Sequence, residues 1–177
     1  MENIDSAPTE PPPRPSWLRV LAIGKNPRTT VIRALISAAI LVGIFRFILL
    51  PVQVKGMSMQ PTYRNGTINF VNRAAFWFRE PKRSDVVGYA ITGQSAMLFK
   101  RVIALPGETI QIRDGVVFIN ERELEEPYLK YRATWNTKPV ALATNEYFLI
   151  GDNRGMSQTD HDFGRGPRDH VVGKALW

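Results

Sequence analysis

The chain has 177 residues, a formal net charge of +7, 44% hydrophobic residues and no cysteine. This length allows one domain with a hydrophobic core and little beyond it. The lack of cysteine excludes disulfides, thiolate zinc sites and a cysteine protease, but it does not fix the compartment. The positive charge could indicate nucleic acid. However, acidic residues are interleaved with the basic ones and no basic helix or RNA-binding signature occurs, so we expect no nucleic-acid partner.

The N-terminal segment is rich in proline. Five of residues 1–16 are prolines and few are large and apolar, a composition typical of a disordered or polyproline-like tail. We therefore assign residues 1–30 to a disordered, basic segment that precedes the folded part of the chain.

Residues 31–50 are overwhelmingly apolar and predict a transmembrane helix. About twenty helical residues, at about 1.5 Å of rise each, cross a hydrocarbon core of roughly 30 Å. Arg33 and Arg46 lie near opposite ends of the segment, where their side chains can snorkel to the two interfaces. Because only twelve residues separate these arginines, a buried or interfacial helix is the alternative.

The charges around this segment predict its orientation. Several basic residues precede it and few follow it closely, and the positive-inside rule then places the N-terminus in the cytoplasm. The apolar run starts late, and no small-x-small cleavage site follows it, so we expect a signal anchor rather than a cleavable signal peptide. The preceding basic residues are Arg14, Arg19, Lys25, Arg28 and Arg33.

Beyond Pro51, short runs rich in valine, isoleucine, phenylalanine and tyrosine alternate with glycine, proline, asparagine and aspartate. This pattern predicts a mainly β fold, with an antiparallel catalytic domain over residues 51–177. Asp114 and Gly115 supply the positive φ angles of a tight hairpin turn, so residues 110–112 should pair with 117–119. The expected strands are 67–71, 85–91, 97–103, 109–112, 116–119 and 146–150.

One helix-like window, residues 73–79, contains the aromatic cluster of Phe76, Trp77 and Phe78. We favour core packing for this cluster, because large aromatic side chains bury much apolar area. The alternative is contact with membrane lipid, since basic residues flank the rings and suit a bilayer interface.

Ser58 and Lys100 are the candidate catalytic pair, in the runs GMSMQPT and FKRVIALPGE. A serine nucleophile must lose its proton as it attacks, so an unprotonated base must lie within reach. Lysine has an ordinary pKa of about 10.4, so burial must lower it. Leu98 and Val102, on the same strand face as Lys100, supply apolar surroundings. Alone, Ser58 would be an ordinary turn serine and Lys100 a surface lysine; their joint occurrence supports the pair.

The two histidines, His161 and His170, lie near the C-terminus among charges, glycine and proline. We expect His161 to be a surface or ion-pairing residue rather than a catalytic base. Clustered histidine, cysteine or carboxylate ligands and phosphate-binding loops do not occur in the sequence, so we expect no metal and no cofactor.

Four sequence blocks together resemble bacterial type I signal peptidases, the leader peptidases with a Ser-Lys dyad that remove signal peptides from exported preproteins. Two of the blocks hold Ser58 and Lys100. The others, RSDVV at 83–87 and GDNRGMS at 151–157, are similar to the family's RGDVV and GDNRxxS boxes. The blocks occur in the family's order and span most of residues 52–175.

The resemblance implies roles for further residues. It implies that the amide of Ser58 helps to form the oxyanion hole and that Ser157 orients the ammonium group of Lys100. Gly56 occupies a position where some members carry a serine whose hydroxyl donates to the oxyanion, so we expect a backbone N–H to replace that donor here.

The resemblance also implies cleavage after small residues, with a second small side chain three positions before the cut. A peptide bound as an added strand presents alternate side chains to one face, so two shallow pockets would recognise these positions. The pocket residues are not identified by the sequence; candidates are Ile68, Phe70, Val86 and Leu98.

The C-terminal box departs from the family. Thr159 and His161 stand where the family has aspartate and arginine, so the usual ion pair cannot form. Asp160 or Asp162 could instead pair with Arg154 or with Arg165.

The sequence therefore predicts a membrane-bound serine endopeptidase that cleaves signal peptides from preproteins. Preproteins and membrane lipid are its expected partners. It is expected to cross the bacterial inner membrane once, with its catalytic domain in the periplasm. Two alternatives are a dedicated processing peptidase of the pilin or conjugation type, and a membrane-anchored β protein that binds signal peptides without catalysis.

Overall fold

The computed structural model describes residues 26–91, 97–161 and 163–176, and the chain divides into two compact units, residues 1–42 and 43–177. The tail predicted for residues 1–16 lies outside the described residues. Apart from the α-helical part of the apolar helix, which ends at Gly43, every helix and strand described below lies in the second unit.

An apolar helix occupies the position predicted for the membrane anchor. The α-helix α2 (Pro27–Gly43) continues into a π-helical turn η1 (Ile44–Ile48), and the 22 residues are long and apolar enough to cross a membrane. The helix starts at Pro27, whose fixed φ suits a first helical position, and Asn26 accepts a hydrogen bond from the Arg28 amide at 3.1 Å. The helix begins four residues earlier than the predicted segment, 31–50, and ends two residues earlier.

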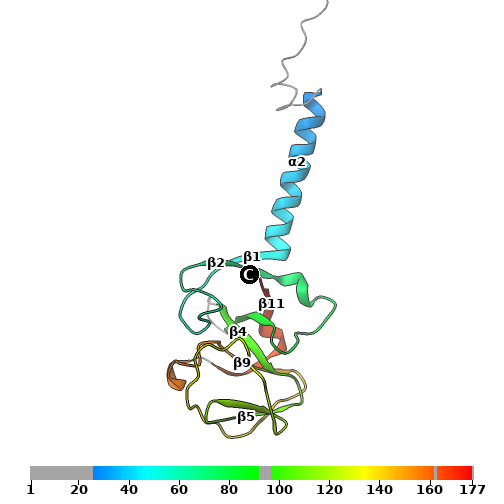
Figure 1. The fold of residues 1–177 in the computed structure, drawn as a ribbon. Helices are drawn as coiled ribbons and strands as arrows, with labels where there is room; N and C mark the ends of the chain where they lie inside the picture. Colours follow the sequence, from blue (N-terminus) through cyan, green and yellow to red (C-terminus); the bar gives the residue numbers. More distant parts are fainter. Residues whose placement is uncertain (1–25, 92–96, 162, 177) are drawn as a thin grey trace, which may run out of the picture. The chain divides into compact units, whose positions relative to one another are not determined.

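The second unit is built from two antiparallel sheets (Figure 1). The order in the seven-stranded sheet is β1-β2-β11-β3-β4-β9-β10, and in the four-stranded sheet it is β7-β6-β5-β8. The strands are β1 (Leu49–Gln53), β2 (Ile68–Asn72), β3 (Val86–Ala90), β4 (Met97–Ala104), β5 (Thr109–Arg113), β6 (Val116–Ile119), β7 (Arg122–Glu123), β8 (Val140–Ala141), β9 (Glu146–Ile150), β10 (Gly164–Pro167) and β11 (Val171–Ala175). Short 3-10 turns are η2 (Arg73–Phe76), η3 (Gln158–Asp160) and η4 (Arg168–His170).

The predicted mainly β, antiparallel fold is confirmed, and each of the six predicted strands occurs with its ends within one residue of the expected positions. The hairpin at Asp114 and Gly115 is also confirmed, because these residues have φ angles of +46° and +79° and Ile110 pairs with Ile119 across it. A Cβ at Gly115 would lie 2.0 Å from the carbonyl oxygen of Ala133. Glycine is therefore required by space as well as by φ.

Apolar residues of both sheets form the core. One cluster joins β4 and β9 of the large sheet to β5 and β6 of the small sheet, and a second lies beneath the loop that carries Ser58. The first cluster includes Ile103, Ile110, Ile112, Val117, Trp135 and Ile150, and the second includes Val54, Met59, Tyr63, Val71, Val86 and Phe99.

The aromatic cluster at the end of η2 is split between core and surface. Phe76 is 8% exposed and belongs to a third core cluster, whereas Trp77 is 59% exposed and Phe78 is 97% exposed. The prediction of core packing is therefore confirmed for Phe76 and wrong for Trp77 and Phe78, since the chain turns after one short helical turn and aims these rings outward.

Candidate active site

Ser58 lies in the long loop of the β1–β2 hairpin. The base of this loop is closed by two backbone hydrogen bonds, from the Val54 amide to Thr67 at 2.9 Å and from the Gly66 amide to Val54 at 2.8 Å. Gly56 has a φ of +95°, a conformation that favours glycine, and its amide donates to the side chain of Asn65 at 3.0 Å. The Gly56 amide is thus engaged inside the loop.

Lys100 lies on β4, between β3 and β9 in the sheet. Its side chain is 2% exposed, and its Nζ donates a hydrogen bond to the Oγ of Ser58 at 3.3 Å. The fold therefore brings together the two predicted residues, although 42 positions separate them in the chain. A lysine amine beside a serine hydroxyl in a buried setting is the geometry that activation of a serine by a lysine base requires.

The segment after β9 fixes the loop around Ser58. The backbone amide of Asn153 donates to the carbonyl oxygen of Ser58 at 2.9 Å, and its side-chain Nδ2 donates to the carbonyl oxygen of Met57 at 3.1 Å. Among the described residues, the amide of Ser58 itself makes no hydrogen bond. That N–H group is therefore available to a ligand.

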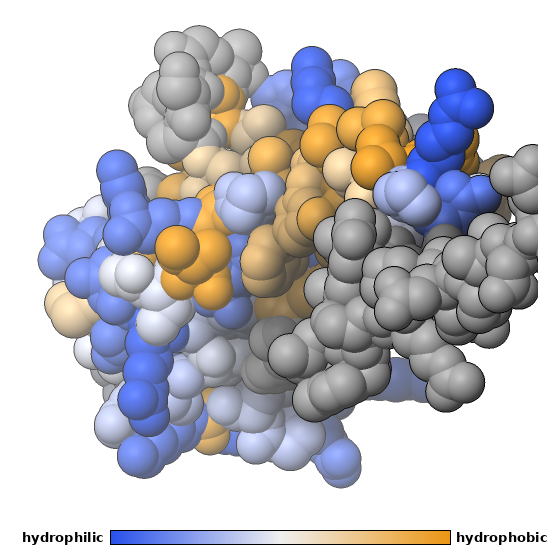
Figure 2. Space-filling view, turned by 90° about the horizontal axis from the view of Figure 1, so that it is seen from above, coloured by the Kyte–Doolittle hydropathy of each residue, from blue (hydrophilic) through white to orange (hydrophobic). Residues whose placement is uncertain are grey.

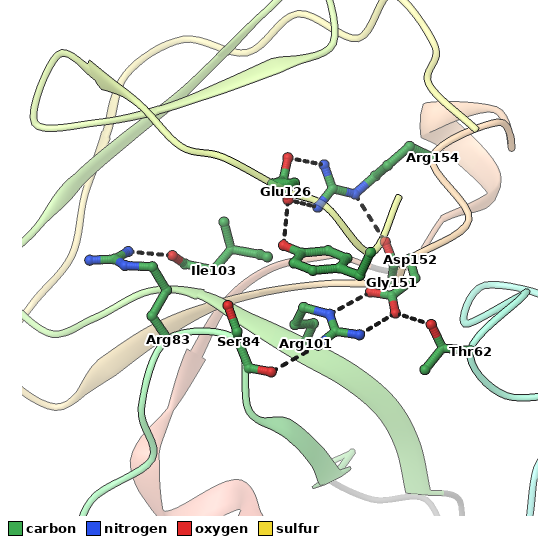
Figure 3. Close-up of polar contacts among 10 residues, drawn as sticks. Thr62, Arg83, Ser84, Arg101, Ile103, Glu126, Gly151, Asp152 and Arg154 are labelled. Atoms are coloured by element: carbon green, nitrogen blue, oxygen red, sulfur yellow. Dashed lines mark hydrogen bonds and ion pairs between the residues drawn. The ribbon is translucent and has the colours of Figure 1, made fainter. Parts of the chain in front are cut away.

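A buried ion pair joins Arg101 of β4 to Asp152, in the segment after β9 (Figure 3). Asp152 is fully buried and accepts two hydrogen bonds from the Arg101 guanidinium, at 2.8 and 2.5 Å, and one from the Thr62 hydroxyl at 2.5 Å. Arg101 also donates to the carbonyl oxygen of Ser84 at 2.8 Å. Because Arg101 adjoins Lys100 on β4 and Thr62 belongs to the Ser58 loop, Asp152 holds the two segments in register.

A second buried ion pair extends this network. Arg154 donates to both carboxylate oxygens of Glu126, at 2.6 and 3.2 Å, and both side chains are 3% exposed. Glu126 also accepts from the Tyr128 hydroxyl at 2.7 Å, and the Tyr128 ring covers the Arg101 guanidinium at 3.9 Å. Burial, and after it the charge of Glu126, raises the pKa of Tyr128 well above its ordinary value. Arg154 thus pairs with Glu126, from the irregular chain between β7 and β8, and not with Asp160; Asp162, the other predicted partner, lies outside the described residues.

His161 is buried beneath the Ser58 loop. It is 2% exposed, its ring meets Trp135 edge-on with centroids 4.9 Å apart, and neither ring nitrogen has a hydrogen-bond partner among the described residues. Burial, and then the nearby charges of Lys100 and Arg154, lower the pKa of His161 to about 4. The expectation of a surface or ion-pairing histidine is wrong, because the ring turns inward to an aromatic wall and stays neutral.

The packing around His161 also explains Gly151. A Cβ at position 151 would lie 2.2 Å from the Ser58 carbonyl oxygen and 2.7 Å from the His161 ring. The glycine of the GDNR box therefore lets the Ser58 loop approach β9.

Comparison with known proteins shows the family of the chain. A model of the signal peptidase family, peptidase S26, matches residues 28–177. The chain belongs to this family. It is 29% identical to a probable signal peptidase I-2 of Synechocystis sp., over 99% of this chain and 80% of that one, and 34% identical to signal peptidase I T of Bacillus subtilis, over 80% and 79%. A crystal structure of a signal peptidase I from Enterococcus faecalis V583 is 28% identical, with a TM-score of 0.44 over 54% of this chain and 97% of that one.

Membership of the signal peptidase family confirms the resemblance drawn from the four sequence blocks. It also confirms the expectation of a serine endopeptidase that cleaves signal peptides from preproteins. Signal peptidases of this type are membrane-anchored, and this member has one helix near its N-terminus, Pro27–Ile48, that is long and apolar enough to cross a membrane.

Thr159, one of the two residues of this signal peptidase that depart from the family box, contacts Ser157. Ser157 is exposed, and it caps η3 by accepting a hydrogen bond from the Thr159 amide at 3.3 Å, while its hydroxyl lies 2.7 Å from the Thr159 hydroxyl. Its orienting role toward Lys100 stays a prediction. Thr159 therefore keeps a polar contact at the position of the family's aspartate, without a charge.

Two cavities flank the serine and lysine of the signal peptidase. A small one, of about 10 Å³, includes Gly56, Ser58, Met59, Met97 and Phe99 in its lining. A larger one, of about 230 Å³, is lined by Tyr89, Ile91, Leu98, Lys100, Leu149, Phe163, Gly164, Arg165 and Gly166. Leu98 lines both cavities, whereas the other predicted pocket candidates, Ile68, Phe70 and Val86, line neither.

Proposed function

We propose that Ser58 and Lys100 are the catalytic dyad with which this signal peptidase cleaves preproteins. The observation that carries the proposal is the 3.3 Å hydrogen bond between Lys100 Nζ and Ser58 Oγ at a lysine that is 2% exposed. Loss of hydration disfavours the ammonium form of a lysine, and a general base must be neutral. Leu98 and Leu149, which line the cavity beside Lys100, add apolar surroundings.

Acylation begins as Ser58 Oγ bonds to the carbonyl carbon of the scissile peptide and Lys100 takes the hydroxyl proton. The carbonyl oxygen becomes an oxyanion, for which the amide of Ser58 supplies one donor. The Lys100 ammonium then gives its proton to the leaving amine as the carbon–nitrogen bond breaks. The signal peptide remains on Ser58 as an ester, and Lys100 is neutral again.

Deacylation repeats these steps with water. Lys100 takes a proton from a water molecule as that molecule's oxygen bonds to the ester carbon, and the proton passes to Ser58 Oγ as the ester bond breaks. The signal peptide leaves with a new carboxylate. No group besides the two side chains, a backbone amide and water is needed for this balance.

The size of the small cavity supports a preference for small residues before the cut. A cavity of about 10 Å³ is near the minimum that one water molecule occupies, so a large side chain cannot enter without displacing the lining. Its lining comes from the chain after β1 and from the start of β4. A peptide laid between these segments would present alternate side chains to them.

We further propose that helix Pro27–Ile48 spans the bacterial inner membrane with its N-terminus in the cytoplasm, as the basic residues before it favour. Figure 2 shows a face of the molecule where hydrophobic and hydrophilic residues lie side by side. Trp77 and Phe78 are exposed aromatic residues, a kind that suits the lipid interface. Their replacement by serine should weaken the binding of the second unit, residues 43–177 prepared without detergent, to anionic vesicles. Unchanged co-sedimentation would contradict lipid contact at this point.

The proposed dyad is tested by cleavage of a purified preprotein by the detergent-solubilised chain. Ser58→Ala and Lys100→Met should each abolish cleavage, while Lys130→Met, at an exposed lysine outside the site, should not change it. Circular dichroism would show that the variants are folded. Cleavage that survives Lys100→Met would overturn the proposed base.

A further inference from the structure

We propose that the 230 Å³ cavity on the Lys100 side of the dyad binds the first residues after the cleavage site, and that Arg165 there selects acidic over basic side chains. This inference rests on the proposed function, because it starts from the direction of the proton transfers. It concerns the part of the preprotein that becomes the mature N-terminus.

The chemistry of the dyad assigns the two cavities to the two sides of the scissile bond. The acyl part of the substrate stays bonded to Ser58 Oγ, whereas the leaving amine must come within hydrogen-bond reach of Lys100 Nζ to receive its proton. Ser58 lines only the small cavity and Lys100 lines only the large one. The chain that follows the cut therefore starts at Lys100 and continues toward the large cavity.

The cavity is built by neighbouring strands of the large sheet. Residues of β3, β4, β9 and β10 line it, and these strands are consecutive in the sheet order. Gly166 keeps it open, since a Cβ there would lie 2.6 Å from the Tyr89 hydroxyl and force the ring to move. Its volume is below the range of small-molecule sites and suits one or two side chains.

The charges of the lining indicate the preferred side chain. The cavity has apolar walls, and among the described residues that line it the one charged side chain besides the proposed base Lys100 is the cationic Arg165. Tyr89 adds a polar group to the lining, and its hydroxyl lies 3.2 Å from Nδ1 of His170. Arg165 is exposed, so it can meet a carboxylate without a large desolvation cost. A lysine at the same substrate position would be repelled.

The test is a preprotein series that carries Asp, Asn or Lys at each of the first three positions after the cut. We expect the wild-type chain to show a higher kcat/KM for Asp than for Lys at one of these positions. Arg165→Glu should change the Asp-to-Lys ratio by about tenfold, and Arg165→Gln by about threefold, as expected for an exposed charge pair. Arg122→Glu, at an exposed arginine of β7, is the charge-matched control and should leave the ratio unchanged.

A second substrate separates this inference from the proposed function. A methyl ester of the same signal-peptide sequence has no residues after the cut, so its hydrolysis needs the dyad but not the large cavity. Arg165→Glu should hydrolyse it at the wild-type rate, which also shows that the variant is folded. An unchanged Asp-to-Lys ratio at all three positions, or an altered preference before the cut, would overturn the inference while ester hydrolysis persists. Failure of the wild-type chain on both substrates would overturn the proposed function and this inference with it.

Discussion

Lys100 and Arg101 are adjacent basic residues of β4, but their side chains lie in different surroundings. Arg101 meets the carboxylate of Asp152, the carbonyl of Ser84 and the ring of Tyr128, whereas Lys100 meets the hydroxyl of Ser58 beside apolar walls. Neighbouring residues of a strand point to opposite faces, so one strand can hold an ion-paired guanidinium on one face and the proposed base on the other. The contacts of Arg101 hold β4 against the Ser58 loop, and Lys100 on the other face contacts the proposed nucleophile.

The largest expected effect on cleavage comes from replacing Lys100 by arginine, the residue that adjoins it on β4. Lys100→Arg keeps a positive side chain, but a guanidinium does not lose its proton in proteins and cannot act as a base. We expect kcat for preprotein cleavage to fall by about a thousandfold or more, as for Lys100→Met. Single-turnover cleavage measures the effect. Substantial activity in Lys100→Arg would mean that the base is another group.

Changes at Arg101 should lower the stability of the fold. Arg101→Met leaves Asp152 buried without its partner, and removing one member of a buried pair costs about 3 to 5 kcal/mol. Urea unfolding in detergent should show this loss. Adding Asp152→Asn should recover part of it, because the uncompensated charge is then removed. If Arg101→Met costs less than about 1 kcal/mol, the ion pair does not hold the loop and strand together as described.

The two sides of β4 also differ in how far the sequence could predict them. Ser58 and Lys100 were predicted because each lies in a short motif and the proposed chemistry requires the two together. Glu126 and Tyr128 were missed, since the irregular chain between β7 and β8 has no periodicity and their role depends on contacts with Arg154 and Arg101. Burial of His161 was missed because its charged neighbours in the sequence suggest a surface position.

The same limit applies to the strands. Runs with regular apolar alternation, such as β5 and β6, were predicted with their register, because a tight turn joins them locally. β10 contains two glycines and a proline, and β7 and β8 have two residues each, so they lack a local signal. They exist because a neighbouring strand offers hydrogen bonds, which is a property of the tertiary fold.

His161 is buried near Lys100 and Arg154 and should make the stability of the fold depend on pH. Its pKa is about 4 in the folded chain and about 6.5 when unfolded, so the unfolded state binds more protons between these values. Stability from this residue is complete above pH 6.5 and falls as the pH drops toward 4, by about 3 kcal/mol in all. His161→Gln removes this titration. Urea unfolding at pH 5 and 7.5 should therefore show a smaller pH dependence in the variant, and equal dependences would contradict a buried neutral imidazole.

Replacement of Ser157 should give the smallest effect on activity. It tests whether Ser157 helps to align Lys100. Its hydroxyl already engages Thr159, so it constrains the chain after β9 whether or not it also orients Lys100. We expect Ser157→Ala to lower kcat by about tenfold with little change in KM, because only the alignment of the base is disturbed. Thr159→Val removes the same contact from the other side and separates the two roles. If both variants lose activity equally, the Ser157–Thr159 contact acts as a brace; a loss confined to Ser157→Ala would mean that the serine hydroxyl acts on Lys100 itself.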